Sequence, residues 1–257
     1  MQFSSAGQAR VAHVLLNRPH ARNAITVALA EGLRDALAAA AESADVVVIR
    51  GVGGHFSAGG DFHEVSRLRA QGPAALRPLF ETFIGACELI AQLPVPVVAA
   101  VEGYAMAGGF ELVQSVDIAL VRDDAVLADN HINFGMIPGG GGSQRLPRIV
   151  GLPRALGHIL TGDRLTGAEA AAWGLVYRSV PAEEFEPALD ALVTTLAAKD
   201  RTALARVKHL VRTGLRRSLT DGLACEVEAT LEHLGAEQAA AGTGRFTGAR
   251  SATTGES

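Results

Sequence analysis

Short apolar runs separated by polar, glycine-rich stretches divide the first 180 residues of the chain. Each run has the length of a strand and lacks a helical period; the runs are 11–16, 46–49, 95–101, 118–121, 125–128 and 176–180. The run from Val46 to Ile49 is apolar at every position. Continuous apolarity over that length predicts a strand buried on both faces, as in a layered α/β protein.

Helical periods fill several of the stretches between these strands. The predicted helices are 26–41, 80–93, one that begins at Ser143 or Gln144, and 166–173. Thr26 is suited to cap the first helix, and Thr166 with Glu169 matches the capping-box pattern at the last. The polar stretch 63–78 is assigned neither helix nor strand.

Beyond residue 181 the pattern changes to helix alone, with segments at about 183–198, 200–214 and 218–235. This change predicts two parts: a core over residues 1–181 and a helical segment over 182–257 whose Ala-, Gly-, Thr- and Ser-rich end we expect to be mobile. The helical segment has more apolar positions than an appended layer needs, among them Leu189, Leu192, Leu196, Leu204, Val207 and Leu210. Such an excess predicts an interface between copies of the chain.

Composition and charge narrow the functional classes. The net charge of −4 and the pI near 6.1 do not indicate the basic surface of a nucleic-acid-binding protein. No apolar run approaches the roughly 20 residues that span a bilayer, and the N-terminus lacks a signal-peptide pattern. The two cysteines, Cys87 and Cys225, fit no metal or redox spacing. We therefore expect a cytoplasmic protein without a metal, a membrane partner or a nucleic-acid partner.

The stretch 101–117 is the first candidate for chemistry. A predicted buried strand runs into it and is followed by three glycines, Gly103, Gly108 and Gly109, after which a helical pattern begins at Phe110. The free N–H groups of a helix N-terminus stabilise negative charge, and Glu111 falls in that first turn. The alternative is a tight strand–helix junction whose surface glutamate is favoured by the helix dipole.

A second glycine-rich loop, F-S-A-G-G-D at 56–61, also follows a buried strand. If the two strands are neighbours, both loops emerge at one sheet edge, where each can offer a backbone N–H to the same carbonyl oxygen. Two such donors form an oxyanion hole, and loss of one typically costs about 10²–10³ in rate. No Rossmann or P-loop glycine pattern is present, so we expect no nicotinamide or nucleotide-triphosphate cofactor.

Four segments together resemble the crotonase superfamily, the enoyl-CoA hydratase/isomerase fold. They are L-N-R-P-H-A-R-N-A-I at 16–25, F-S-A-G-G-D at 56–61, G-Y-A-M-A-G-G-F-E-L at 103–112 and I-P-G-G-G-G-S-Q-R-L at 137–146. Their order and spacing match the family over nearly the whole chain. The resemblance implies a ββα spiral core, C-terminal helices that build a homotrimer or a dimer of trimers, and an acyl-CoA substrate.

The resemblance also assigns roles to residues. It implies that Ala58 and Gly108 supply the oxyanion-hole N–H groups and that Glu111 is the first catalytic glutamate, which holds or activates water. Residues implied in substrate binding are Gly59, Gly60, Asp61, Gly109, Arg22 and Phe246. Arg22 would meet CoA, although a solvated arginine is the simpler interpretation, and the segment around Phe246 matches the family only loosely.

His131 stands where the hydratases carry their second catalytic glutamate, which delivers a proton to C2. An imidazole, with an ordinary pKa near 6.5, is suited to proton transfer, but His131 could instead pack against the loop and bond a carbonyl. The sequence therefore favours hydration or dehydration at C2–C3 of a CoA thioester. It leaves open isomerisation, decarboxylation, C–C hydrolysis or retro-aldol cleavage of an acyl-CoA, and a non-catalytic acyl-CoA-binding homologue.

Overall fold

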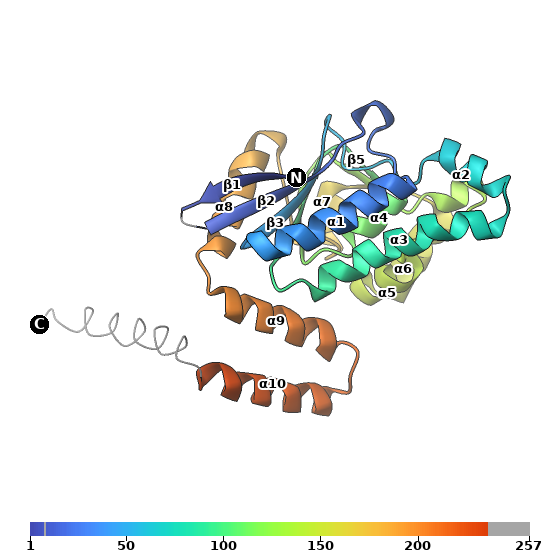
Figure 1. Cartoon of the computed structure of the whole chain (residues 1–257). Helices are drawn as coiled ribbons and strands as arrows, with labels where there is room; N and C mark the ends of the chain where they lie inside the picture. Colours follow the sequence, from blue (N-terminus) through green and yellow to red (C-terminus); the bar gives the residue numbers. More distant parts are fainter. Residues whose placement is uncertain (8, 236–257) are drawn as a thin grey trace, which may run out of the picture. The chain divides into compact units, whose positions relative to one another are not determined.

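A six-stranded sheet in the order β1-β2-β3-β4-β6-β9 forms the centre of the first of two structural units (Figure 1). In this computed structural model, which describes residues 1–7 and 9–235, β1 is antiparallel to β2 and the other neighbouring strands are parallel. The strands are β1 Gln2–Ala6, β2 Ala9–Leu16, β3 Val46–Gly51, β4 Val97–Val101, β6 Ile118–Arg122 and β9 Arg178–Val180.

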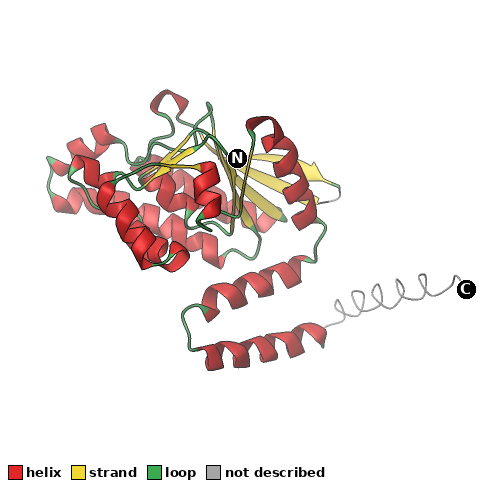
Figure 2. Ribbon diagram, turned by 180° about the vertical axis from the view of Figure 1, so that it is seen from behind, coloured by secondary structure: helices red, strands yellow, loops and turns green. Residues whose placement is uncertain are grey.

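A second, three-stranded sheet in the order β5-β7-β8 lies beside the first and carries the site described below (Figure 2). Its strands are β5 Tyr104–Met106, β7 Val126–Ala128 and β8 Leu165–Thr166. β5 pairs with β7 in parallel, and β7 pairs with β8 antiparallel. The chain therefore enters this sheet directly after β4 of the large sheet, through the glycine turn at Gly103.

Helices cover both faces of the large sheet. The helices of the first unit are α1 Val27–Ser43, α2 Phe62–Arg69, α3 Pro73–Gln92, α4 Gly108–Val113, α5 Gly142–Val150, α6 Leu152–Thr161, α7 Gly167–Ala172 and α8 Phe185–Ala197, of which α1 and α3 cover one face and α8 the other. Three short 3-10 helices are η1 Pro19–Ala21, η2 His131–Phe134 and η3 Ala182–Glu184. The second unit, as far as it is described, contains α9 Arg201–Gly214 and α10 Leu219–Leu234.

The alternation of side chains along β3 separates two hydrophobic clusters. Val47 and Ile49 lie in a large cluster with the buried residues of α1 and α3, whereas Val46 and Val48 lie in a smaller one with Phe185 of α8. All four β3 side chains are fully buried. The predicted strand buried on both faces is confirmed, and the reason is that helices cover the sheet on either side.

The predicted strands and helices all correspond to observed elements, but the boundaries differ in two places. The polar stretch 63–78 is helical, since it forms most of α2 and the start of α3. α8 packs on the large sheet, so the chain divides after Arg201 rather than near residue 181. None of the described helices is both long and apolar enough to cross a lipid bilayer.

Asn23 joins the segment after β2 to the loop after β3. Its side chain is fully buried; Oδ1 accepts from the Arg18 N–H at 2.8 Å, and Nδ2 donates to the carbonyls of Val52 and His55 at 2.9 and 2.7 Å. These bonds bring the turn 18–25 against the loop that leads to residues 56–61. A buried amide with all three partners satisfied fixes that contact.

Replacing Asn23 by Ala should lower the free energy of unfolding by about 3 kcal/mol, because three partly buried backbone groups lose their partner and each costs about 1 kcal/mol. Urea denaturation followed by circular dichroism measures the change. Asn17→Ala is the matched control, because Asn17 is exposed on the same segment. Equal denaturation midpoints for the two variants would show that the Asn23 bonds do not stabilise this junction.

Candidate active site

The two glycine-rich loops lie against each other, as the sequence suggested. Ser57 donates its N–H to the Tyr104 carbonyl at 2.8 Å and accepts from the Met106 N–H at 2.9 Å. A Cβ on Gly59 would lie 2.7 Å from Ala107 Cβ, and one on Gly109 would lie 2.5 Å from the Ser57 carbonyl oxygen. Gly59 and Gly109, predicted to bind substrate, are thus required by the close approach of the loops.

Two backbone N–H groups remain available where the loops meet. Within the described residues, no hydrogen bond engages the N–H of Gly60 or of Gly108, and both residues line one cavity. The N–H of Ala58, predicted as an oxyanion donor, instead donates to the Arg22 carbonyl at 2.9 Å. Gly60 nitrogen would lie 3.8 Å from a Cβ on Gly108, so the two free donors are close neighbours.

The turn before α4 is strained. Ala107, the residue that precedes the helix, has φ 48° and ψ −116°, a conformation that a residue with a side chain rarely adopts. Its N–H donates to the Ala128 carbonyl at 2.8 Å, which fixes the turn to the end of β7. The strained turn therefore couples the start of α4, with Gly108, to the segment that follows β7.

Glu111 is buried in the first turn of α4, with 2% of its surface exposed. Its Oε1 accepts two backbone N–H groups from the following glycine loop, those of Gly140 at 2.7 Å and Gly142 at 2.8 Å. Burial raises the pKa of Glu111; the two hydrogen bonds and the nearby His131 oppose that rise and do not cancel it. With Oε1 occupied, Oε2 is the oxygen left to act in the cavity.

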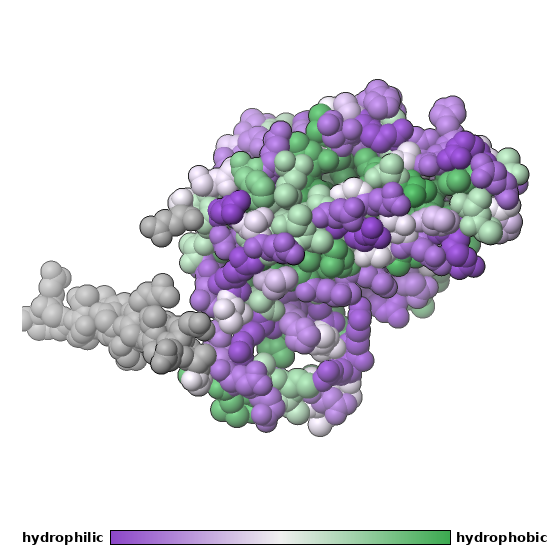
Figure 3. All heavy atoms as spheres, in the orientation of Figure 1, coloured by the Kyte–Doolittle hydropathy of each residue, from purple (hydrophilic) through white to green (hydrophobic). Residues whose placement is uncertain are grey.

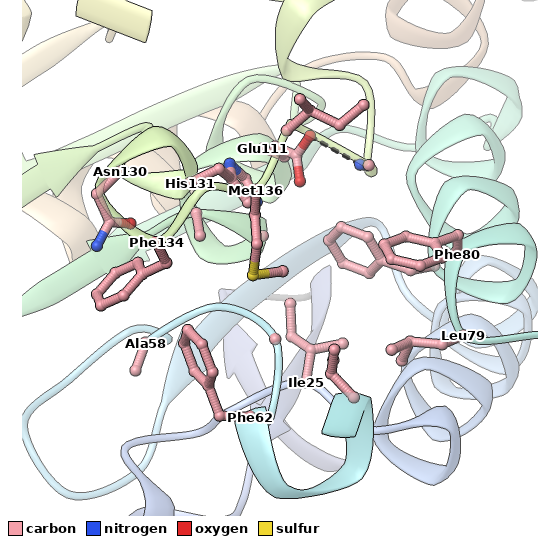
Figure 4. Close-up of a pocket in the computed structure, with 18 residues that line it drawn as sticks. Ile25, Ala58, Phe62, Leu79, Phe80, Glu111, Asn130, His131, Phe134 and Met136 are labelled. Atoms are coloured by element: carbon pink, nitrogen blue, oxygen red, sulfur yellow. Dashed lines mark hydrogen bonds between the residues drawn. The ribbon is translucent and has the colours of Figure 1, made fainter. Parts of the chain in front are cut away.

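His131 begins η2 and lies near Glu111 in the same cavity (Figure 4). Its Nδ1 is 2.6 Å from Oδ1 of Asp129, a carboxylate that is completely buried at the end of β7. Burial alone would lower the pKa of His131, but the hydrogen bond and charge of Asp129, together with Glu111, raise it overall. The sequence identified His131 and left Asp129 open, either as a residue at a strand end or as a partner that assists His131.

The rest of the cavity is apolar. Figure 4 shows Glu111 and His131 on one side of it and Ile25, Leu79 and Phe62 on the other. The cavity has a volume of about 80 Å³, and its apolar lining includes Ile25, Phe62, Val65, Leu79, Phe80, Phe83, Phe134 and Met136. Most of these residues belong to α2 and α3. Phe80 and Phe83 fall in the helix predicted over 80–93, but the sequence did not identify the individual side chains that line the cavity.

The remaining predicted residues lie elsewhere. Asp61 caps α2, accepting from the N–H groups of His63 and Glu64, and pairs with Arg18 at 2.9 Å. The Arg22 guanidinium lies over the Tyr104 ring, 5.5 Å from its centre. Phe246 falls outside the described residues. The described part of the chain contains no cluster of His, Cys, Asp and Glu able to hold a metal ion.

Comparisons with known proteins identify the family of the chain. A family profile for enoyl-CoA hydratase/isomerase matches residues 6–254. A probable enoyl-CoA hydratase of Rhizobium meliloti is 37% identical over 222 residues, covering 85% of this chain and 84% of the relative. One of Mycobacterium leprae is 34% identical over 220 residues, with 84% and 83% covered.

Solved structures give the same result for the fold. The crystal structure of enoyl-CoA hydratase from Bacillus anthracis superposes with a TM-score of 0.89 at 30% identity, and 96% of each chain is covered. Human enoyl-CoA hydratase domain-containing protein 3 also superposes at 0.89, with 27% identity over 96% of each chain. The α/β core is thus the crotonase fold, and the chain belongs to the enoyl-CoA hydratase/isomerase family.

Proposed function

We propose that this protein is an acyl-CoA enzyme of the enoyl-CoA hydratase type, which adds water to or removes it from C2–C3 of a thioester. The observation that carries the proposal is that two free backbone N–H groups and two proton-transfer groups line one cavity, namely Gly60 with Gly108 and Glu111 with His131. Relatives described as probable enoyl-CoA hydratases support the reaction class.

In the hydration direction, the thioester carbonyl oxygen accepts the N–H groups of Gly60 and Gly108, so charge that develops on it is stabilised. A water held by Glu111 adds its oxygen to C3 while Oε2 of Glu111 takes the proton. The electron pair of the C2–C3 double bond moves to the thioester, which gives an enolate. His131 then gives a proton to C2, and the net change is the addition of one water molecule.

The cavity wall favours an uncharged acyl group. Its described lining contains no lysine or arginine, and apart from Glu111 and His131 the side chains are apolar except for Asn130. A decarboxylase for a dicarboxylic acyl-CoA needs a cation or hydrogen-bond donors for the second carboxylate, and only His131 and Asn130 could supply them. This supports hydration over the decarboxylase alternative, and the buried acid–base groups argue against a pure binding protein.

We also propose a homotrimer or a dimer of trimers in which the second unit forms the interface. No residue of α9 or α10 is buried within the chain. Apolar atoms are visible on the surface of these helices in Figure 3. The large exposed apolar residues there are Val207, Val211, Leu215, Leu219, Leu223, Val227, Leu231 and Leu234. A surface of that kind marks a protein interface.

Glu111→Gln should lower kcat by about 10²–10⁴ while the Kd for a CoA thioester changes little, because binding rests on backbone donors and apolar contacts whereas proton transfer needs the carboxylate. Calorimetric titration with acetoacetyl-CoA measures binding, and crotonyl-CoA hydration measures turnover. Glu88→Gln, an exposed glutamate of α3, is the control. Absence of binding by the unmodified protein to thioesters of several chain lengths would exclude the acyl-CoA assignment.

His131→Gln should lower kcat and abolish the limb of the pH–rate profile that reports the histidine, because the Gln amide does not titrate in that range and cannot act as a general acid. Since the pKa of His131 is raised, hydration in the unmodified protein should decline as pH rises through that value. His20→Gln, at an exposed histidine, should leave the profile unchanged. An unaltered profile in His131→Gln would assign His131 a role in shaping the pocket only.

Light scattering on the unmodified protein at micromolar concentration should give a mass that is a multiple of three chains. Leu223→Glu, which places a charge on the apolar surface of α10, should shift the mass toward smaller species, while Glu226→Gln on the same helix should not. A stable monomer for the unmodified protein would contradict the proposed assembly.

A further inference from the structure

We propose that Asp129 is a positioning residue that fixes the orientation and tautomer of His131, so that Nδ1 carries a proton toward Asp129 and Nε2 is the nitrogen that serves the substrate. The inference rests on the proposed function in naming His131 as the proton donor. It concerns a carboxylate that lies outside the cavity lining and has no assigned part in the reaction.

The first argument concerns which atom donates and which accepts in the hydrogen bond between Asp129 and His131. Asp129 Oδ1 and His131 Nδ1 are 2.6 Å apart, and the aspartate has no exposed surface. A carboxylate offers acceptor oxygens and a ring nitrogen that faces it can donate, so we assign the shared hydrogen to Nδ1. The other ring nitrogen, Nε2, is then the one free to accept or give a proton. A carboxylate that binds one ring nitrogen of a histidine commonly determines that the other nitrogen transfers the proton.

The second argument is that Asp129 is itself held in place. Its backbone N–H donates to Nε2 of His158 at 3.1 Å, and His158 is buried near the end of α6 with 3% of its surface exposed. Burial lowers the pKa of His158, which keeps the ring neutral and its Nε2 able to accept. The ring lies beside Phe110 and Trp173, with centroids 5.3 and 5.9 Å away. His158 thus anchors the backbone from which the carboxylate projects.

The third argument concerns the space between the two carboxylates. A Cβ on Gly142 would lie 2.8 Å from Asp129 Oδ2 and 3.2 Å from Glu111 Oε1. Because Gly142 has no side chain, both carboxylates can approach it, and its N–H donates to Glu111. Asp129 Oδ2 has no hydrogen-bond partner within the described residues. Two acids this close to one glycine both favour the protonated form of His131, which pairs with Asp129.

The carboxylates near His131 determine the direction in which its pKa is shifted. The charged groups acting on His131 are Asp129, at the end of β7, and Glu111, in α4. Both favour the imidazolium, so its stabilisation is complete below the ordinary histidine pKa and is lost as pH rises through the higher folded value. Asn at position 129 keeps the size of the side chain and removes its charge, so it should let the His131 pKa fall.

The test uses the full chain labelled with ¹⁵N-histidine, with His131→Gln to assign the His131 signals. In the unmodified protein we expect Nδ1 to stay protonated across the titration while Nε2 changes. In Asp129→Asn we expect the midpoint to move to lower pH, the falling limb of the pH–rate profile to move with it, and kcat to drop about 10–100-fold with KM little changed. Asp117→Asn is the control, because Asp117 accepts the Val97 N–H outside the cavity.

A proton on Nε2 with a bare Nδ1 in the unmodified protein would overturn the proposal without any variant, even if Asp129→Asn failed to fold. An unchanged midpoint in a folded Asp129→Asn protein would overturn it as well. The titration needs no turnover, so it is independent of the hydratase assignment. If the tautomer and midpoint behave as expected while no thioester is hydrated, the proposed function fails and the role of Asp129 stands.

Discussion

The burial of the Glu111 carboxylate is the constraint on which the site depends. A carboxylate with 2% exposure needs hydrogen-bond donors, and here both come from backbone about thirty residues further along, at Gly140 and Gly142. A Cβ on Gly140 would lie 2.6 Å from Glu111 Oε2, and one on Gly142 would lie 3.2 Å from Oε1. Side chains at Gly140 and Gly142 would collide with the Glu111 carboxylate, so the glycine loop is needed for its backbone N–H groups to reach the buried acid.

Close packing of glycine backbone also shapes the part of the cavity where the two glycine-rich loops meet. The loops 56–61 and 103–109 approach so closely that Gly59 and Gly109 have no room for a Cβ. Their contact is made by backbone hydrogen bonds at Ser57, and it leaves the N–H groups of Gly60 and Gly108 free at the surface of the cavity. Positional precision here comes from main-chain packing on two sheets, which is stiffer than a loop carrying donor side chains.

Sequence patterns predicted the elements that pack into the hydrophobic core, and they missed the helix whose apolar side chains mainly line the cavity. The β3 strand was predicted because every residue is apolar, and α1 because Thr26 and an apolar stripe mark it. α2 was not assigned, because only Leu68 of its residues is buried in the chain while Phe62 and Val65 face the cavity. Ala58 was chosen as a donor by motif position; its bond to the Arg22 carbonyl depends on a turn 36 residues away, which no local pattern reveals.

Asp129 and His131 form a coupled pair, and this explains why the histidine cannot be treated as a simple exchange for glutamate. A glutamate at position 131 would place its carboxylate close to the buried Asp129 and near Glu111, with no described arginine or lysine in the cavity lining to offset the charge. Like charges at such distances force at least one acid to stay protonated. A glutamate at position 131 would therefore need a neutral residue at position 129, so the residues at these two positions depend on each other. The buried aspartate raises the pKa of His131 and so favours the imidazolium at this position.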